Sequence, residues 1–315
     1  MALTLGSLFR LGYLNGFHFG PIRARTFGMS AQLFALSSAI SYAASTISAR
    51  LGMTTSTPIT MTCISLVIHA VSLSAIVFLT GGIPQVSTVA VVLFVIVGFL
   101  MPVMRLLTYT GIAKIGASRS GTLRSAHPLF SVLIAITVLH EEPSRVVLMG
   151  TFLAVLGIVI ISWQPGERLS SSRRWYVLFP LAASFLAGLV HPIIRYALGI
   201  SNYPLFFAAL VGIVSLLTLV GYLALVRPPQ QPVWNRKAMW PFMAAALFET
   251  LGFFLFNTAM GAGPVVIVSP IIGTVPMWVL IGTVVLLRKL EQVTFRTVLG
   301  TCSVVAGTVA ISLGG

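Results

Sequence analysis

The sequence predicts an all-α integral membrane protein in which ten transmembrane helices form two inverted repeats of five. Three observations lead to this fold class. Of the 315 residues, 57% are hydrophobic and 8% are charged, whereas about 25% are charged in an ordinary soluble domain. Apolar stretches of roughly 20 residues, the length that crosses a bilayer, recur along the whole chain. The pattern of the first half also returns in the second half.

Each predicted span is one of these apolar stretches, and Gly, Pro or charged residues mark the turns between them. The spans are expected at about 30–49, 58–80, 87–108, 117–139, 145–163, 176–198, 203–226, 239–260, 264–286 and 294–313. Gly81-Gly82 ends the second span, Pro143 precedes the fifth, and Arg227-Pro228-Pro229 closes the seventh. These residues permit or force backbone angles that helices do not use.

The longest polar segment divides the spans five and five. We expect a first five-helix repeat at 30–163, a polar linker at 164–175 and a second repeat at 176–315. Residues 1–29 form an N-terminal tail to which we assign no role. A targeting segment, an interfacial helix, a disordered tail and a translation start at Met29 all fit its sequence.

An internal repeat links the two halves. Glu, Gly and Gly recur with one spacing in both, and both copies close on the dipeptide Ile-Ser: Glu141, Gly150, Gly157 and Ile161-Ser162, then Glu291, Gly300, Gly307 and Ile311-Ser312. Five spans per half is an odd number, so the second half must enter the membrane upside down relative to the first. Inverted repeats are typical of transporters, whose substrate site lies near the midplane where the halves meet.

The stretch from Tyr109 to Trp163 resembles the repeat of the drug/metabolite transporter superfamily, EamA-like branch. It has small residues at the start of its fourth span, a Pro within that span, a Glu in the following loop and a Gly-spaced fifth span. Asn257 to Ser312 echoes this pattern, and the resemblance runs from about residue 30 to the end. It implies a ten-helix carrier of metabolites such as amino acids, with relatives that carry nucleotide sugars and sugar phosphates.

The loops that carry the Glu differ from the Gly-Glu-basic pattern that is usual in that family. They read His140-Glu141-Glu142-Pro143 in the first half and Arg288-Lys289-Leu290-Glu291 in the second. The resemblance therefore implies the fold and the general activity, and it does not assign a substrate.

The chain is strongly basic, with 19 Lys and Arg against 5 acidic residues and a net charge of +14. In a soluble protein this balance would suggest a nucleic-acid partner. Here the basic residues punctuate apolar runs, as the positive-inside rule expects, so no nucleic-acid partner is predicted. Most of them fall on the side opposite the N-terminus, which places both termini outside the cytoplasm. The family resemblance implies the reverse, and both orientations stay open.

Ionisable groups inside spans are costly, and they mark candidate sites. The candidate substrate-binding residues are Arg124, His127, His191, Arg195, Glu249, Arg105, Asn257, Ser41 and Tyr109. Arg124 and His127 share a helix face, as do His191 and Arg195, because residues three or four apart are neighbours on a helix. We expect a positive cavity lined by spans one, three, four, six, eight and nine, with three Arg against one Glu. Such a cavity favours a carboxylate or another anion.

Structural roles compete with these assignments. Arg105 and Arg195 lie near span ends, where long basic side chains can reach the headgroups. Glu249 can serve as a structural ion pair, or as the exchangeable proton site of a drug or cation exporter. His127 and His191 precede Pro residues and can bond to backbone carbonyls that the Pro leaves free. The Gly-spaced fifth and tenth spans, including Ala154 and Ala306, are expected to pack helix on helix.

Signals of catalysis are missing from the sequence. There is no Asp, no dinucleotide-binding or phosphate-binding Gly motif and no nucleophile elbow. Cys63 and Cys302 both lie in apolar runs without metal-ligand spacing. We therefore expect no enzyme activity, no cofactor and no metal, and transport driven by a gradient or by exchange.

The sequence thus predicts a secondary-active carrier of a small polar or anionic metabolite, such as an amino acid or an organic acid. We expect an exporter or exchanger that works by alternating access in the plasma (inner) membrane. The alternative is a proton-coupled exporter of drugs or cations that uses Glu249. The expected partners are a small-molecule substrate and the lipid bilayer, and a homodimer is left open.

Overall fold

The computed structural model describes residues 27–80, 82–127, 129–130, 144–162, 175–226, 231–263, 268 and 271–314. Within these residues the chain forms ten α-helices and one short 3-10 helix. They are α2 (Phe27–Gly52), α3 (Pro58–Leu79), α4 (Thr88–Ile115), α5 (Ala117–Arg124), α7 (Arg145–Ser162), η1 (Trp175–Val177), α9 (Leu178–Ile200), α10 (Pro204–Val226), α11 (Arg236–Ala262), α13 (Val275–Leu286) and α14 (Phe295–Gly314). The predicted tail up to residue 26, nearly all of the predicted linker, and Glu141 lie outside the described residues.

Membrane-spanning character is clear for half of the predicted spans. In the described part of the chain, five helices are long and apolar enough to cross a bilayer: α3, α4, α9 together with η1, α10 and α11. Three shorter apolar helices, α7, α13 and α14, also occur. The all-helical class of the prediction is confirmed, and the full count of ten spans stays a prediction.

The fourth and ninth spans were predicted at about 117–139 and 264–286. In the described residues, neither span is one continuous helix. α5 ends at Arg124 and a turn follows at Ser125 and Ala126, whereas α13 begins at Val275 after a turn at Thr274. Pro276 lies in the first turn of α13, where its missing N–H breaks no helical hydrogen bond. Both interruptions fall inside the helix bundle.

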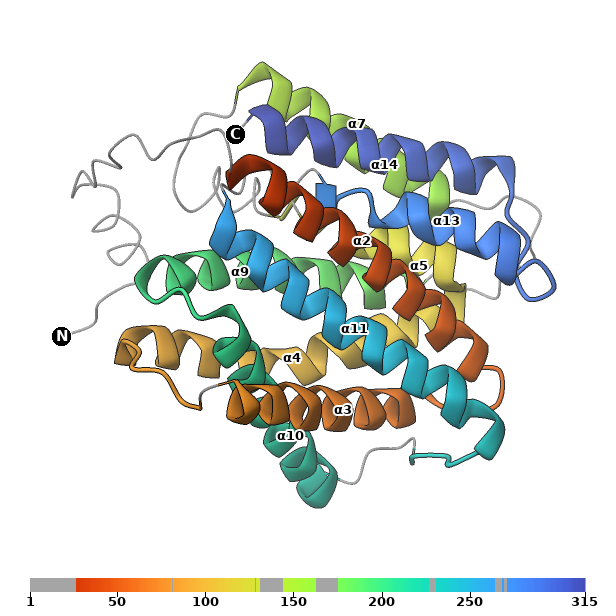
Figure 1. The fold of residues 1–315 in the computed structure, drawn as a ribbon. Helices are drawn as coiled ribbons and strands as arrows, with labels where there is room; N and C mark the ends of the chain where they lie inside the picture. Colours follow the sequence, from red (N-terminus) through yellow and green to blue (C-terminus); the bar gives the residue numbers. More distant parts are fainter. Residues whose placement is uncertain are drawn as a thin grey trace.

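Helix pairing follows the internal repeat. α2 packs on α11, and α4 packs on α9. Exchanging the two halves turns the first of these contacts into the second, because α2 corresponds to α9 and α4 to α11. The contacts of α3 with α10 and of α7 with α14 map onto themselves. Figure 1 shows α7 and α14 along one edge of the bundle, with α3 and α10 toward the opposite edge and α2 and α11 between them.

Small residues make the closest helix contacts. Along α2, buried alanines recur every fourth residue, at Ala31, Ala35, Ala39 and Ala43, which places them on one helix face. In lipid, helices associate through such close backbone approach because the apolar solvent gives no hydrophobic drive. The hydroxyl of Ser38 adds a hydrogen bond across the contact, to the carbonyl of Gly252 on α11 at 2.8 Å.

The α7–α14 contact is made by the repeated glycines. A Cβ on Gly157 would lie 2.6 Å from the carbonyl oxygen of Gly300, and one on Gly150 would lie 2.8 Å from that of Gly307. Only glycine permits this approach, so these positions hold the two helices backbone to backbone. Ala306, expected in the same contact, is instead exposed, because the glycines and Val304 already fill the side of α14 that faces α7.

The opposite helix faces expose large apolar side chains. On α4 these are Val92, Ile96, Phe99 and Val103, which recur every three or four residues. Apolar area on this scale is not left facing water in a soluble monomer. The outer surface is therefore a lipid-facing one, and the polar side chains gather inside the bundle.

Candidate functional site

A pocket lies at the centre of the bundle, with a volume of about 110 Å³. Its walls come from α2, α4, α5, α9, α11 and the start of α13. These are the elements of the six spans that the sequence predicts around a cavity. The space is large enough for several water molecules or for a small polar molecule. The broken ends of α5 and α13 both reach it, an arrangement typical of substrate sites in transporters.

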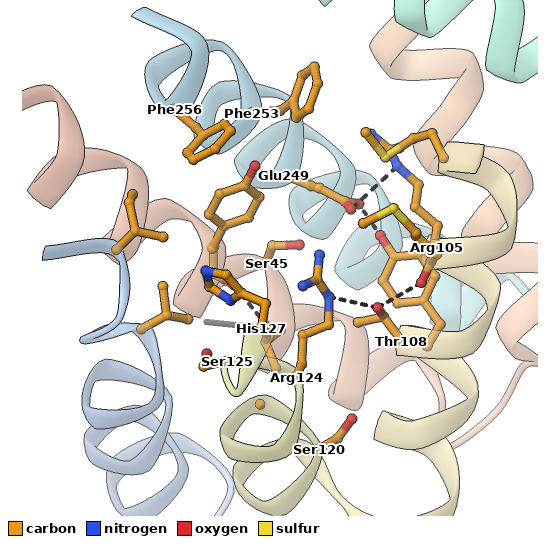
Figure 2. Close-up of a pocket in the computed structure, with 18 of the residues that line it drawn as sticks. Ser45, Arg105, Thr108, Ser120, Arg124, Ser125, His127, Glu249, Phe253 and Phe256 are labelled. Atoms are coloured by element: carbon orange, nitrogen blue, oxygen red, sulfur yellow. Dashed lines mark hydrogen bonds and ion pairs between the residues drawn. The ribbon is translucent and has the colours of Figure 1, made fainter. Parts of the chain in front are cut away.

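Arg105 and Glu249 form an ion pair in the pocket wall. Arg105 Nε lies 3.4 Å from Glu249 Oε1, and the side chains are only 3% and 16% exposed. The hydroxyl of Tyr109, one turn along α4 from Arg105, donates a hydrogen bond to Glu249 Oε2. Both carboxylate oxygens therefore have a partner, and Figure 2 shows them held against one side of the pocket.

A second contact fixes Arg105 from behind. Its Nη2 donates to Nδ1 of the fully buried His69 at 3.0 Å. This requires a proton on His69 Nε2, which donates to the carbonyl of Ala208 on α10 at 3.1 Å. The His69 ring also packs closely against Gly212 of α10, where an added Cβ would lie 2.6 Å from the ring. This series of contacts, from Ala208 through His69 and Arg105 to Glu249, links α10, α3, α4 and α11.

Arg124 has a different environment. It lies in the last turn of α5, and its Nε donates to Thr108 Oγ1 at 2.9 Å. Thr108 in turn donates to the carbonyl of Met104. In the part of the chain that the structure describes, no carboxylate lies within 4.0 Å of this guanidinium. Figure 2 shows it reaching from α5 toward the middle of the pocket, between Ser45 and Thr108.

Aromatic rings form another wall. The rings of His127 and His191 meet edge to face with centroids 4.6 Å apart, and His191 lies 4.9 Å from Phe256. Phe253 and Phe256, one helical turn apart on α11, are 5% and 3% exposed. In Figure 2 both phenylalanines lie across the pocket from the backbone that carries Arg124. The pocket therefore has a cationic end and an apolar, aromatic end.

Six of the nine predicted site residues line this pocket: Arg105, Tyr109, Arg124, His127, His191 and Glu249. Three do not. The hydroxyl of Ser41 donates to Ser37 and the amide of Asn257 to Phe253, each within its own helix. Arg195 donates to the carbonyl of Met260 near the end of α11.

These positions correct the expected cavity charge. The sequence suggested three Arg against one Glu, but Arg195 lies outside the lining and Arg105 is paired with Glu249. The pocket keeps one unit of positive charge, which belongs to Arg124 when the two histidines are neutral.

Other lining residues are absent from the predicted set, including Tyr42, Ser45, Thr46, Thr108, Phe253 and Phe256. Thr108 could have been found, because it follows Arg105 by three residues and shares its helix face. The two phenylalanines carry no such signal. An aromatic residue in an apolar run can face the lipid, a neighbouring helix or a cavity, and the sequence does not distinguish these.

A separate charged junction positions α5. Glu291 accepts a hydrogen bond from Arg50 Nε at 2.7 Å and another from the backbone N–H of Ala117 at 2.6 Å. Ala117 is the first residue of α5, so the carboxylate caps the positive end of the helix that carries Arg124. Gly116, at φ +89°, makes room for it, since a Cβ there would lie 2.8 Å from the carboxylate.

No group of three or more His, Cys, Asp or Glu side chains able to hold a metal occurs in the described ranges. The site combines the partly buried guanidinium of Arg124 with hydroxyl groups and an aromatic wall, a set of groups that can bind an anion.

The comparisons with known proteins agree with the fold. The model of the EamA-like transporter family matches residues 29–163 and 174–313. One solved structure, described as "Crystal structure of protein", is similar over 90% of this chain and 98% of its own, with a TM-score of 0.64 and 15% identity. At that identity the likeness shows the fold alone. A comparison with the curated proteins gives no match.

Proposed function

This chain belongs to the EamA-like transporter family, and from that premise we propose that it is a secondary-active carrier of a small anionic metabolite. It is a multi-pass membrane protein whose family is one of transporters, not of enzymes. We place it in the plasma membrane. We propose that it exports or exchanges this metabolite by alternating access.

The observation that carries the proposal is the guanidinium of Arg124. A cation inside a membrane protein is expensive to hold without a partner, and such residues mark substrate paths. Arg124 points into a pocket at the break of α5, and among the described residues its side chain donates a hydrogen bond only to Thr108. A carboxylate or phosphate bound there would receive two parallel hydrogen bonds from the guanidinium.

The repeat supports alternating access. The pocket lies where elements of both halves meet, and the helix pairs α2–α11 and α4–α9 exchange under the repeat. We propose ten spans in two inverted halves, 30–163 and 176–315, that rock about the pocket. This rocking motion would expose Arg124 first to one side of the membrane and then to the other.

The rival function, proton-coupled efflux of drugs or cations through Glu249, has less support. Arg105 and Tyr109 engage the two oxygens of this carboxylate, and Arg124 would repel a cation. The rival predicts that Glu249→Gln ends resistance to cationic drugs in cells that express the protein. Unchanged resistance would remove Glu249 from any such mechanism.

A thermal-shift panel tests the proposal. A ligand that binds only the folded state raises the apparent melting temperature. The detergent-purified protein would be screened against amino acids, organic acids, sugar phosphates and cationic drugs. We expect at least one anion to stabilise the wild type and not Arg124→Gln. The matched control is Arg236→Gln, which removes the same charge from the exposed first residue of α11. Stabilisation by cations alone would contradict the proposal.

A further inference from the structure

We propose that the substrate is a monocarboxylate with an apolar body and no ammonium group, not an amino acid or an organic cation. This inference rests on the proposed carrier function and narrows its substrate class. It follows from the different partners of Arg124 and Glu249.

The positive end of the pocket has capacity for one anion. Thr108 occupies only Nε of Arg124, so the two terminal nitrogens remain as donors toward the pocket. They match the two oxygens of one carboxylate in the geometry that arginine prefers. One negative charge would neutralise the pocket, whereas a second would find no counter-charge among the described lining residues.

The carboxylate of Glu249 is already engaged by groups of the protein. Among the described residues that line the pocket, Glu249 is the one acidic residue. Arg105 lies beside one of its oxygens, and Tyr109 donates to the other. His69 braces Arg105 from the other side at 3.0 Å, so the ion pair is part of a wall that links several helices. An ammonium group would have to displace Arg105 or stay unpaired in a buried site, and a buried charge without a partner is strongly unfavourable.

The remaining surface suits an apolar body. Phe253 and Phe256 lie across the pocket from Arg124 (Figure 2), and Ile194, Val190 and Ile272 extend the same lining. A ligand whose carboxylate meets Arg124 would place its other end against these side chains. A sugar at that end would exchange most of its water for apolar side chains, with the rings of His127 and His191 as the polar groups nearby.

Two matched ligand series test the inference. In the first, 4-methylpentanoate, L-leucine and 3-methylbutylamine share one branched body but carry an anion, a zwitterion and a cation. In the second, 3-phenylpropanoate, L-phenylalanine and 2-phenylethylamine do the same with a phenyl ring. Binding would be measured by thermal shift and by competition in proteoliposomes, on wild type, Arg124→Gln, Arg124→Lys and Arg236→Gln.

We expect at least one of the carboxylates to bind at least about tenfold more tightly than its amino acid and amine partners, given the cost of an unpaired buried charge. Arg124→Gln should abolish this binding. Arg124→Lys should weaken it, because lysine keeps the charge but loses the two-pronged geometry. Arg236→Gln should bind as the wild type does.

Two results would overturn the substrate class. In one, leucine or phenylalanine binds as tightly as its carboxylate partner, which means that Glu249 opens to receive an ammonium. In the other, neither carboxylate binds the folded wild type. If a different anion such as a sugar phosphate then bound in an Arg124-dependent way, the carrier function would stand while this inference failed. If no anion bound, both would fail.

Discussion

The guanidinium of Arg105 lies 3.4 Å from the carboxylate of Glu249, and this pair leaves Arg124 as the cation that faces the pocket. Both arginines line the pocket, but their contacts differ. Arg105 pairs with Glu249 between α4 and α11, and we propose that Arg124 offers its charge to a ligand.

Removing the carboxylate of the pair should destabilise the protein. Glu249→Gln leaves the buried Arg105 without its counter-charge, a change that typically costs about 3–5 kcal/mol. The double variant Arg105→Met with Glu249→Gln should recover part of this loss, because no buried charge is then left unpaired. Thermal unfolding of the purified variants measures both. Equal stability of Glu249→Gln and the wild type would show that the pair contributes nothing.

The packing of His69 against α10 can be tested at a glycine. A Cβ at Gly212 would lie 2.6 Å from the His69 ring and 3.0 Å from the backbone of Ala70. Gly212→Ala should therefore lower stability by about 1–3 kcal/mol, the usual cost of overpacking. It should also weaken ligand binding, because Arg105 loses its support.

Gly221→Ala is the matched control for that substitution. Gly221 lies on the same helix with nothing within 4 Å of a Cβ, so alanine there should leave stability unchanged or raise it by about 0.5–1 kcal/mol. Equal effects of the two substitutions would contradict the packing described for His69.

The repeated glycines of α7 and α14 should be equally intolerant of a side chain. Gly157→Ala drives a Cβ into the carbonyl of Gly300, and Gly300→Ala drives one toward Ile161 and the carbonyl of Gly157. Either change should separate the helices and lower the melting temperature. Gly199→Ala, with nothing within 4 Å, should not. A melting temperature of Gly157→Ala at or above that of Gly199→Ala would contradict the contact.

The Glu291 junction should affect binding from a distance. Glu291→Ala removes the acceptor of Arg50 and of the Ala117 N–H. Hydrogen bonds to a charged group contribute about 1.5–3 kcal/mol each, and the carboxylate also stabilises the start of α5. Since α5 positions Arg124, we expect lower stability together with weaker anion binding. Weaker stability with unchanged binding would show that the junction does not position the site.

Periodicity and composition predict much of this fold. The apolar runs locate the helices, and the spacing of Glu and Gly reveals the repeat that the helix pairing follows. The sequence also identifies Arg105, Arg124 and Glu249 as residues of interest, because charge inside an apolar run is rare and conspicuous.

Contacts between side chains are harder to predict from the sequence than the helices themselves. Glu291 and Arg50 lie far apart in the chain, and nothing local marks their contact. Ser41 and Asn257 are polar and buried, yet each bonds to its own helix, a choice that depends on rotamer and not on residue type. Pro128 follows Arg124 by four residues and disfavours helix just before it, but the sequence does not show at which residue α5 ends.

The most direct test of the account is transport by proteoliposomes that contain wild-type protein, Arg124→Gln or Arg236→Gln. The labelled substrate would be the anion that stabilises the wild type most in the thermal-shift panel, with the same anion preloaded inside to drive exchange. The account predicts exchange by the wild type and Arg236→Gln, and a loss of at least about tenfold in Arg124→Gln, since removing one partner of a buried charge pair costs about 2–5 kcal/mol. Exchange at the wild-type rate by folded Arg124→Gln would contradict it, because the anion would then cross without the cation assigned to bind it.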